Sequence, residues 1–305
     1  MSDQQSQLTR RAMMGAVAGL SVSGTVLPAR AQFSLDLGKI GDIGRMLKGM
    51  NLDEEDEIAL GQDLFGSLIQ TMGGLYRNAD AQKALSSIAV KLFETSARSA
   101  FSWEAVVVDN NEVNAWALPG GKIGVNKGLL RYVDSEDELA AALAHEMGHA
   151  ELSHAAKEMK KKAFYAGLST AAQAAAVAAA DSRSSRIGAG AGMESIALPM
   201  LRLVTSGYSR DLEYEADNYI VETFQKVGYD VDRGSRFYET LLDIIPEKAK
   251  GTTSLFAGHP QTEKRLAALR EAGAAAPHAD ELFNPDFYAL KQSFPTRKIY
   301  KRAAG

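Results

Sequence analysis

The spacing of apolar side chains changes along the chain, and each change predicts a different element of secondary structure. In two stretches, residues 53–68 and 85–93, apolar residues recur every three or four positions, which is the spacing of one helix face. The first stretch opens with an acidic turn, as many helices do. Residues 104–108 form a short run rich in valine, which is typical of a buried strand. Residues 113–117 and 122–125, on either side of a Pro-Gly-Gly turn, predict a β-hairpin.

The helical spacing returns near residue 135 and continues through the rest of the chain. Ser135 and Glu138 have the spacing of a capping box, with Ser135 as the N-cap and the Glu138 side chain reaching back to it. The helix that follows is expected to begin near Glu136 and to run well past Ser153. Further helices are expected at residues 209–226 with Gly228 as C-cap, at 232–245, at 260–272 with Gly273 as the stop, and after Asn284-Pro285. The whole pattern predicts a mainly helical α+β fold with one small sheet.

Composition narrows the class of protein. The chain has 305 residues, of which 46% are hydrophobic and 24% are charged, as in an ordinary globular protein. Its net charge of -4 gives no basic footprint, so a nucleic-acid partner is not expected. The absence of cysteine excludes disulfide bonds, a thiolate metal site and a lipid-modified N-terminal cysteine.

Residues 1–31 have the pattern of an export signal. Arg10 and Arg11 precede a short apolar stretch and a small-x-small cleavage site, which together predict a cleavable secretory signal. The paired arginines and the weak hydrophobicity favour the twin-arginine route, and an ordinary Sec signal is the alternative. We therefore expect a mature chain that begins near Gln32 and is located in the bacterial periplasm.

The remaining chain divides into three segments. Residues 32–52 are punctuated by glycine and are expected to form a linker, residues 53–273 form one domain, and residues 274–305 form a polar, basic tail. Within the domain, residues 163–192 are dominated by alanine, glycine and serine. This segment is expected to be a lid or a surface helix, and the alternative is a helix that makes peripheral contact with a membrane. The sequence predicts no oligomeric state.

The run His145-Glu146-Met147-Gly148-His149 lies inside the predicted capped helix. Positions four residues apart return to the same helix face, so both imidazoles can reach one metal ion. Glu146 lies one step round the helix and can reach a water molecule in an open coordination position. The pattern arises by chance in roughly one such chain in two hundred, and the apolar flanks predict a buried helix, in which histidines need partners. We therefore prefer a metal site to the alternative of two surface histidines.

A catalytic zinc ion needs three protein ligands and one open position. In the longer His-Glu-x-x-His-x-x-Gly-x-x-His motif, Leu152 stands at the glycine position and Ala155 at the position of the third histidine, so a distant carboxylate is expected. Glu213 and Asp217 share one face of a later predicted helix, which would allow Glu213 to bind the metal and Asp217 to bond a ligand histidine. By spacing alone, Glu213 is equally well explained as a surface acid. Glu215 points elsewhere on that helix and is expected to be solvated.

Three blocks of sequence together resemble the HtpX and CAAX-prenyl-protease family of zinc metallopeptidases. They are the His-Glu-Met-Gly-His helix, the block Ser-Arg-x-x-Glu-x-x-Ala-Asp at residues 209–217, and the stretch Asn-Ala-Trp-Ala-Leu-Pro-Gly-Gly at residues 114–121. The resemblance covers residues 53–272 and is greatest to the soluble periplasmic branch that includes BepA and LoiP. It implies a gluzincin-type protease domain, one zinc ion per chain, Glu213 as the third ligand, and Asp217 as the residue that orients His145.

The resemblance also implies a substrate-binding strand. Asn114, Ala115, Trp116 and Ala117 would form an edge strand that pairs with an extended substrate backbone. The side chain of Trp116 either packs in the core or lines a substrate pocket. Two features of the family are not expected here: a tetratricopeptide array after the protease domain, and transmembrane helices, whose absence disfavours prenyl-protein cleavage.

Other histidines receive weaker assignments. The block Gly258-His259-Pro260, followed by Arg265, resembles a family block near the active site, where His259 would cap the zinc in a latent state or steady the developing oxyanion. The alternative is an ordinary residue at the start of a helix. His154 lies five residues beyond His149, about 140° round an unbroken helix, so it is expected to be a structural or surface residue. His278 lies in the tail and is expected to be solvated.

The expected activity is peptide-bond hydrolysis by a zinc-dependent endopeptidase, with Glu146 as the catalytic base. The resemblance implies unfolded or misassembled envelope proteins as substrates and a role in protein quality control. A second hypothesis is a periplasmic chaperone or assembly factor whose latent zinc site is capped by His259. An aminopeptidase is disfavoured, because the sequence lacks a Gly-Ala-Met-Glu-Asn-like stretch that would bind a substrate amine.

Overall fold

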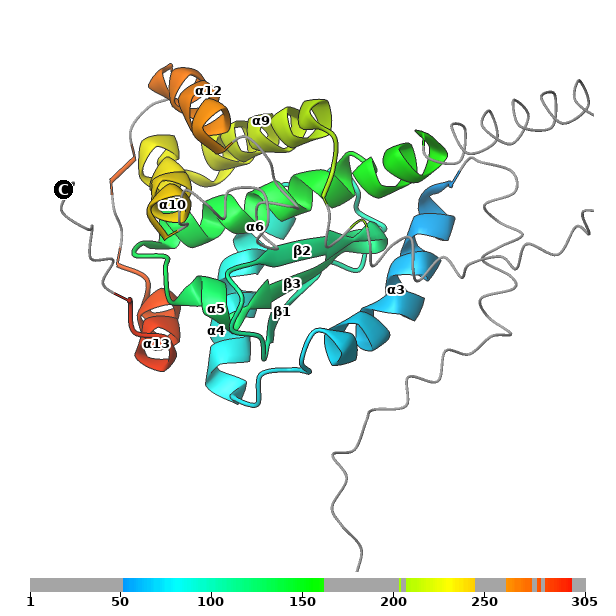
Figure 1. Ribbon diagram of the computed structural model, residues 1–305, viewed down its shortest axis with the longest axis horizontal. Helices are drawn as coiled ribbons and strands as arrows, with labels where there is room; N and C mark the ends of the chain where they lie inside the picture. The colour runs from blue at the N-terminus through cyan, green and yellow to red at the C-terminus, as the bar shows by residue number, and fades with distance from the viewer. Residues whose placement is uncertain are drawn as a thin grey trace, which may run out of the picture. The chain divides into compact units, whose positions relative to one another are not determined.

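The computed structural model describes residues 52–161, 203, 207–244, 262–275, 279–280 and 283–297 (Figure 1). The elements named in these residues are α3 (Glu54–Thr71), α4 (Ala79–Phe93), β1 (Glu104–Val108), β2 (Ala115–Leu118), the short 3-10 helix η1 (Pro119–Gly121), β3 (Lys122–Asn126), α5 (Lys127–Leu130), α6 (Glu136–Glu151), α9 (Arg210–Val227), α10 (Val231–Ile244), α12 (Thr262–Ala274) and α13 (Pro285–Ser293). This mainly helical arrangement with one small sheet confirms the predicted fold class. The predicted signal, the linker up to residue 51, residues 163–192, His259 and His278 lie outside the described residues.

The three strands of the described residues form one mixed sheet in the order β1-β3-β2. β2 and β3 are antiparallel, with Trp116 opposite Gly124, which confirms the predicted hairpin. β1 is parallel to β3 and places Val106 opposite the same glycine. Within the described part of the chain, β2 is therefore an edge strand, and one side of its backbone faces away from β3.

The two faces of the sheet contribute to different parts of the core, because side chains alternate along a strand. One face packs with α4 and α6, and the other packs with α3. Trp116 belongs to the α3 face, where its ring meets Phe65 edge-on with 6.0 Å between the ring centroids. Of the two roles considered for this tryptophan, the structure therefore shows core packing. The α4 and α6 face carries Ala105, Val107, Ala115, Ala117, Ile123 and Val125.

The helix α6 is buried along almost its whole length. Its N-cap is Ser135, whose Oγ accepts a hydrogen bond from the Glu138 backbone N–H at 3.2 Å. The Glu138 carboxylate reaches one residue further back than predicted and accepts from the Asp134 N–H at 2.9 Å. The helix packs against the sheet and against α9 and α10 (Figure 1), and every residue from Asp137 to Glu151 is buried. Polar side chains in its second half therefore need partners inside the protein.

The prediction that this helix runs well past Ser153 is wrong. α6 ends at Glu151, Ser153 has a left-handed backbone with a φ of 53°, and helical residues resume at 154–161. Two distant parts of the chain hold this break. Ser153 Oγ donates to the Glu57 carboxylate at 2.6 Å and accepts from Arg98, whose Nε also donates to the Glu151 carbonyl at 3.2 Å. These contacts offset the roughly 1–2 kcal/mol that a left-handed conformation costs a residue with a side chain.

Two further helices extend the described fold. α12 ends at Ala274, one residue after Gly273, which we predicted as its stop. The glycine allows close packing, since a Cβ there would lie 2.7 Å from the side chain of Val231 at the start of α10. α13 packs against α4 and buries Leu290 in the same core as α6. Among the described residues, no helix has both the length and the apolar character needed to span a membrane.

Candidate metal centre

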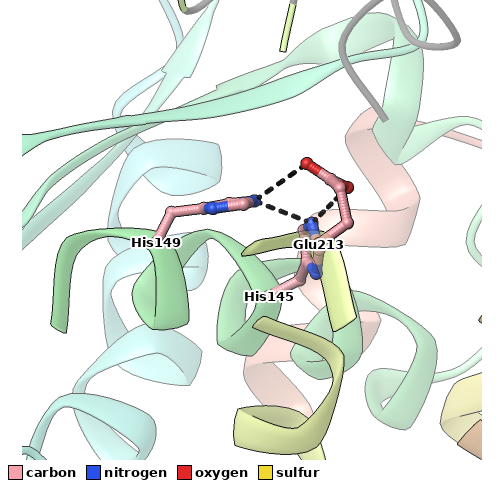
Figure 2. A group of neighbouring side chains, drawn as sticks. All are labelled: His145, His149 and Glu213. Carbon is pink, nitrogen blue, oxygen red and sulfur yellow. Dashed lines mark hydrogen bonds and ion pairs between the residues drawn. The ribbon is translucent and has the colours of Figure 1, made fainter. Parts of the chain in front are cut away.

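Two histidines of α6 and one glutamate of α9 bring three metal-binding atoms together (Figure 2). The Nε2 atoms of His145 and His149 are 3.0 Å apart, and each lies 3.5 Å from an oxygen of the Glu213 carboxylate. All three residues are buried. Zinc bonds of about 2.0–2.1 Å in a tetrahedron put neighbouring ligand atoms roughly 3.3 Å apart. The spacing of the three atoms and their nitrogen and oxygen chemistry therefore fit one zinc ion.

Gly148 lets the two ligand-bearing helices approach closely. A Cβ at this position would lie 3.0 Å from the Cβ of Tyr219 and 3.2 Å from the Cα of Ala216, both on α9. Few real Cβ atoms have contacts this short, so a larger residue would push the helices apart. Glu213 lies one turn before Ala216 on α9, and the close approach brings its short side chain within reach of both histidines.

The His145 side of the centre is a dense network of charged groups. His145 Nδ1 lies 3.0 Å from the Asp217 carboxylate, which also accepts a hydrogen bond from the Tyr238 hydroxyl at 2.7 Å. Arg265 donates to both oxygens of Asp217 at 2.7 Å and forms an ion pair with Glu213, also at 2.7 Å. Arg265 is 2% exposed, so this guanidinium neutralises two buried carboxylates in a region closed to water.

These contacts shift the titration of His145 and Asp217 in the metal-free protein. Burial and the Arg265 charge both lower the pKa of His145, but hydrogen bonds to Asp217 and Glu213 outweigh them and raise this pKa to about 9. Burial raises the pKa of Asp217, but the Arg265 charge and hydrogen bonds outweigh it and hold this pKa well below its usual range. At neutral pH His145 is therefore a cation beside an ionised Asp217.

The His149 side is built from neutral rings. His149 Nδ1 lies 2.8 Å from Nδ1 of His154, a fully buried residue. The ring of Tyr208, just before α9, stacks on the His149 ring with 4.1 Å between centroids. His154 Nε2 lies 3.2 Å from the Glu215 carboxylate, which also pairs with Lys157 at 2.9 Å. Glu215 is exposed, as predicted, but it is bonded to this network. Burial lowers the pKa of His154 to about 4, so its ring is neutral at pH 7.

The prediction for His154 assumed an unbroken helix, and that assumption is wrong. An unbroken helix would turn this residue away from His149, but the left-handed Ser153 turns it back into direct contact. In the described part of the chain, the residues close enough to share a metal ion are His145, His149 and Glu213, and His154 is not among them.

The partners define one consistent set of proton positions across the centre, assigned from hydrogen-bonding capacity. His145 donates from Nδ1 to Asp217, and its Nε2 proton faces both the Glu213 carboxylate and Nε2 of His149. His149 then donates from Nδ1 to Nδ1 of His154, and His154 donates from Nε2 to Glu215. A metal ion held by both Nε2 atoms would replace one proton, the one on Nε2 of His145.

Two of the remaining predicted site residues, Glu146 and Asn114, lie on α6 and directly before β2. Glu146 is 4% exposed, and its charge is one of the causes that raise the pKa of the Tyr208 hydroxyl, after burial. Asn114 is buried directly before β2, and α6 packs against β2. The predicted roles of these residues in catalysis and substrate binding stay predictions, as does the role of His259.

Sequence reasoning missed three residues of the centre, namely Tyr208, His154 as a ligand partner, and Tyr238. Two of them carried a signal that could have been used: Tyr208 is the aromatic residue directly before the Ser209 N-cap of the ligand-bearing helix, and His154 is a second histidine close behind the metal motif. For Tyr238 the sequence offers no such signal.

Comparison with known proteins gives a consistent result. The sequence profile of peptidase family M48 matches residues 77–273, which is well over half of the chain and includes all three grouped residues. A putative beta-barrel assembly-enhancing protease of Vibrio cholerae is 26% identical over 269 residues, which are 86% of this chain and 54% of that protein.

Two proteins of Escherichia coli K12 are also similar. A beta-barrel assembly-enhancing protease is 25% identical over 287 residues, or 93% of this chain and 56% of that protein. The metalloprotease YcaL is 30% identical over 163 residues, or 53% of this chain and 58% of that protein. The chain thus spans about half the length of the curated relatives it matches.

Proposed function

The chain belongs to peptidase family M48 and is by that membership a metalloendopeptidase, and we propose that its metal is zinc and that it cuts envelope proteins in the bacterial periplasm. The membership agrees with the three sequence blocks. The observation that carries the proposal is the convergence of His145, His149 and Glu213 in the protein interior. The three protein ligands found in the described residues leave a fourth tetrahedral position, which is the arrangement of catalytic zinc sites.

The reaction divides between the metal and the side chains around it. When bound, zinc lowers the pKa of a coordinated water molecule and polarises the scissile carbonyl. Glu146 follows the first ligand on α6, and its carboxylate accepts the proton of the attacking water and delivers it to the leaving amine. Asp217 holds the Nδ1 proton of His145 and so keeps Nε2 turned toward the metal position. Arg265 fixes the carboxylates of Asp217 and Glu213 through short ion pairs.

We propose that β2 binds the substrate. It is an edge strand in the described part of the chain, and α6 packs beside it, so a peptide paired with its outer side would lie along the helix that carries Glu146. Trp116 points to the opposite face and contributes stability, not a pocket wall. Main-chain pairing recognises extended backbone and not sequence, which suits substrates that are unfolded or misassembled.

The location and the substrates are proposed from two observations. Residues 1–31 have the pattern of an export signal. Relatives similar to most of the chain are named for enhancing the assembly of β-barrels. Fractionation of bacteria that produce the full chain tests the location, and recovery of all the protein in the cytoplasm would contradict it.

The substitution Glu146→Gln tests the chemistry. We expect purified wild-type protein and the variant each to hold one zinc ion, and we expect the variant to cleave unfolded casein at least about a hundredfold more slowly, because the amide cannot accept a proton. Glu136→Gln, at the start of the same helix, is the control and should keep full activity.

Two outcomes would contradict the proposal in different ways. A Glu146→Gln protein that holds zinc and cleaves at the wild-type rate would exclude Glu146 as the base. If the wild-type protein still cleaves casein after its zinc has been removed by dialysis against a chelator, zinc is excluded as the metal.

A further inference from the structure

The two ligand histidines are supported by different kinds of partner. His145 is supported by a carboxylate, whereas His149 is supported by a second imidazole at 2.8 Å. This second imidazole belongs to His154, which is fully buried and comes from the helical residues after the Ser153 break. Nothing in the proposed reaction uses His154, so its placement needs a separate explanation.

The break in the helix is what places His154 there. Along an unbroken helix, a residue five positions after His149 would lie about 140° away from it. Ser153 adopts a left-handed backbone instead, and Glu57 and Arg98 hold its side chain in that conformation. Ser153 thus has an unfavourable backbone conformation, which side-chain hydrogen bonds stabilise, at the position that turns His154 back toward His149.

The hydrogen bonds then restrict which ring atoms carry protons. Nδ1 of His149 and Nδ1 of His154 are 2.8 Å apart, so one of them donates and the other accepts. The Glu215 carboxylate can only accept, so it draws a His154 proton to Nε2 and leaves Nδ1 of His154 as the acceptor. An acceptor at 2.8 Å from His149 Nδ1 draws the His149 proton to Nδ1. His149 Nε2 is then left with a lone pair that faces His145 and Glu213, which is the form that binds a metal ion.

We propose that His154 is a positioning residue of the metal centre: it accepts the Nδ1 proton of His149, with its own tautomer selected by Glu215, and so holds the His149 lone pair toward the metal position. The inference rests on the proposed zinc site. It adds to that site a hydrogen-bond relay from the Glu215 carboxylate through the His154 ring to the ligand His149. Stacking of Tyr208 on the His149 ring fixes the plane of the ring, and His154 fixes its rotation within that plane.

A matched pair of substitutions tests the relay. His154→Asn places an amide oxygen close to the position of the imidazole Nδ1, so it keeps an acceptor, whereas His154→Leu has nearly the same size as asparagine and has none. We expect His154→Leu to weaken zinc binding about 10- to 100-fold, measured by competition with a chelator in the full chain, and His154→Asn to stay within about threefold of wild type. Equal affinities for the two variants would overturn the proposal.

A spectroscopic measurement separates positioning from simple packing. Nitrogen-15 NMR of the histidine rings in the zinc-free protein should show the His149 proton on Nδ1 in wild type and in His154→Asn, and a mixture of tautomers in His154→Leu. An unchanged His149 tautomer in His154→Leu would contradict the relay. Because the tautomer is read without metal, this result is independent of whether the wild-type protein proves to be a zinc peptidase.

A surface variant covers the case in which His154→Leu does not fold. Glu215 is exposed, so Glu215→Ala leaves the core intact, and Glu222→Ala on the exposed side of the same helix is its control. We expect Glu215→Ala to weaken zinc binding about threefold to tenfold and Glu222→Ala to leave it unchanged. Identical affinities for these two variants would overturn the part of the proposal that assigns Glu215.

Discussion

The two sides of the metal centre solve the same problem with different chemistry. The His145 side holds its ligand with a carboxylate, an arginine and a tyrosine hydroxyl, all buried and linked by short contacts. The His149 side holds its ligand with a neutral imidazole and a stacked phenol ring, and its network ends at an exposed carboxylate. One side fixes geometry with charge, and the other fixes geometry with neutral rings.

The difference shows how the ligands of a metal site can be held in place without adding more negative charge around the metal. Each carboxylate near a metal ion makes the ion a weaker Lewis acid. Asp217 is compensated by Arg265, which also neutralises part of the Glu213 charge. Behind His149, the His154 ring supplies the hydrogen bond without adding a second carboxylate. The following predictions test this contrast.

Removal of the charge compensation on the His145 side should have the largest effect. We expect Arg265→Met to lower the free energy of unfolding by about 3–5 kcal/mol, because it leaves two buried carboxylates without their partner. Urea denaturation of the metal-free protein measures this. Arg270→Met, which removes an exposed arginine of the same helix, should cost at most about 1 kcal/mol. Similar losses for the two variants would show that the buried network contributes no special stability.

The second prediction uses the opposite protonation states of the two sides. Below pH 9, zinc must displace a proton from His145, so its apparent affinity should rise with pH, by up to about tenfold per unit, and level off above 9. His154, whose pKa is lowered to about 4, should contribute no proton in this range. Calorimetry in buffers of different ionisation enthalpy should therefore detect about one proton released per zinc at pH 7. No proton release at pH 7 would contradict the charged state assigned to His145.

The smallest effect is expected on the neutral side. Tyr208→Leu removes the stacked ring from His149 and should weaken zinc binding about threefold to tenfold, which corresponds to the usual strength of an aromatic pair. Tyr288→Leu, an exposed tyrosine of α13, is the control for loss of a tyrosine elsewhere. If Tyr208→Leu lowered the zinc affinity more than Arg265→Met does, the proposed order of the two sides would be reversed.

The sequence was sufficient where the structure depends on local geometry. The helical repeat places His145 and His149 on one face whatever the rest of the fold does, and the same repeat pairs Glu213 with Asp217. The hairpin followed from its turn residues, and the family resemblance selected Glu213 over the other acids of its helix. These features required no knowledge of which elements touch.

The sequence was not sufficient where distant segments decide the outcome. Nothing near Ser153 marks a break in the helix; Glu57 lies almost a hundred positions earlier, and Arg98 lies in another loop. Because the break was not foreseen, His154 was assigned to the wrong face. The parallel pairing of β1 with β3 is likewise a contact between segments separated by the intervening β2.

The bare backbone at Gly148 has a consequence for how the enzyme can change over evolutionary time. The spacing of α6 and α9 at the centre is limited by main-chain atoms and one Cβ, which do not vary with rotamer choice. Substitutions on the exposed side of α9 can therefore accumulate while the two helices keep the separation that brings their ligand-bearing residues together.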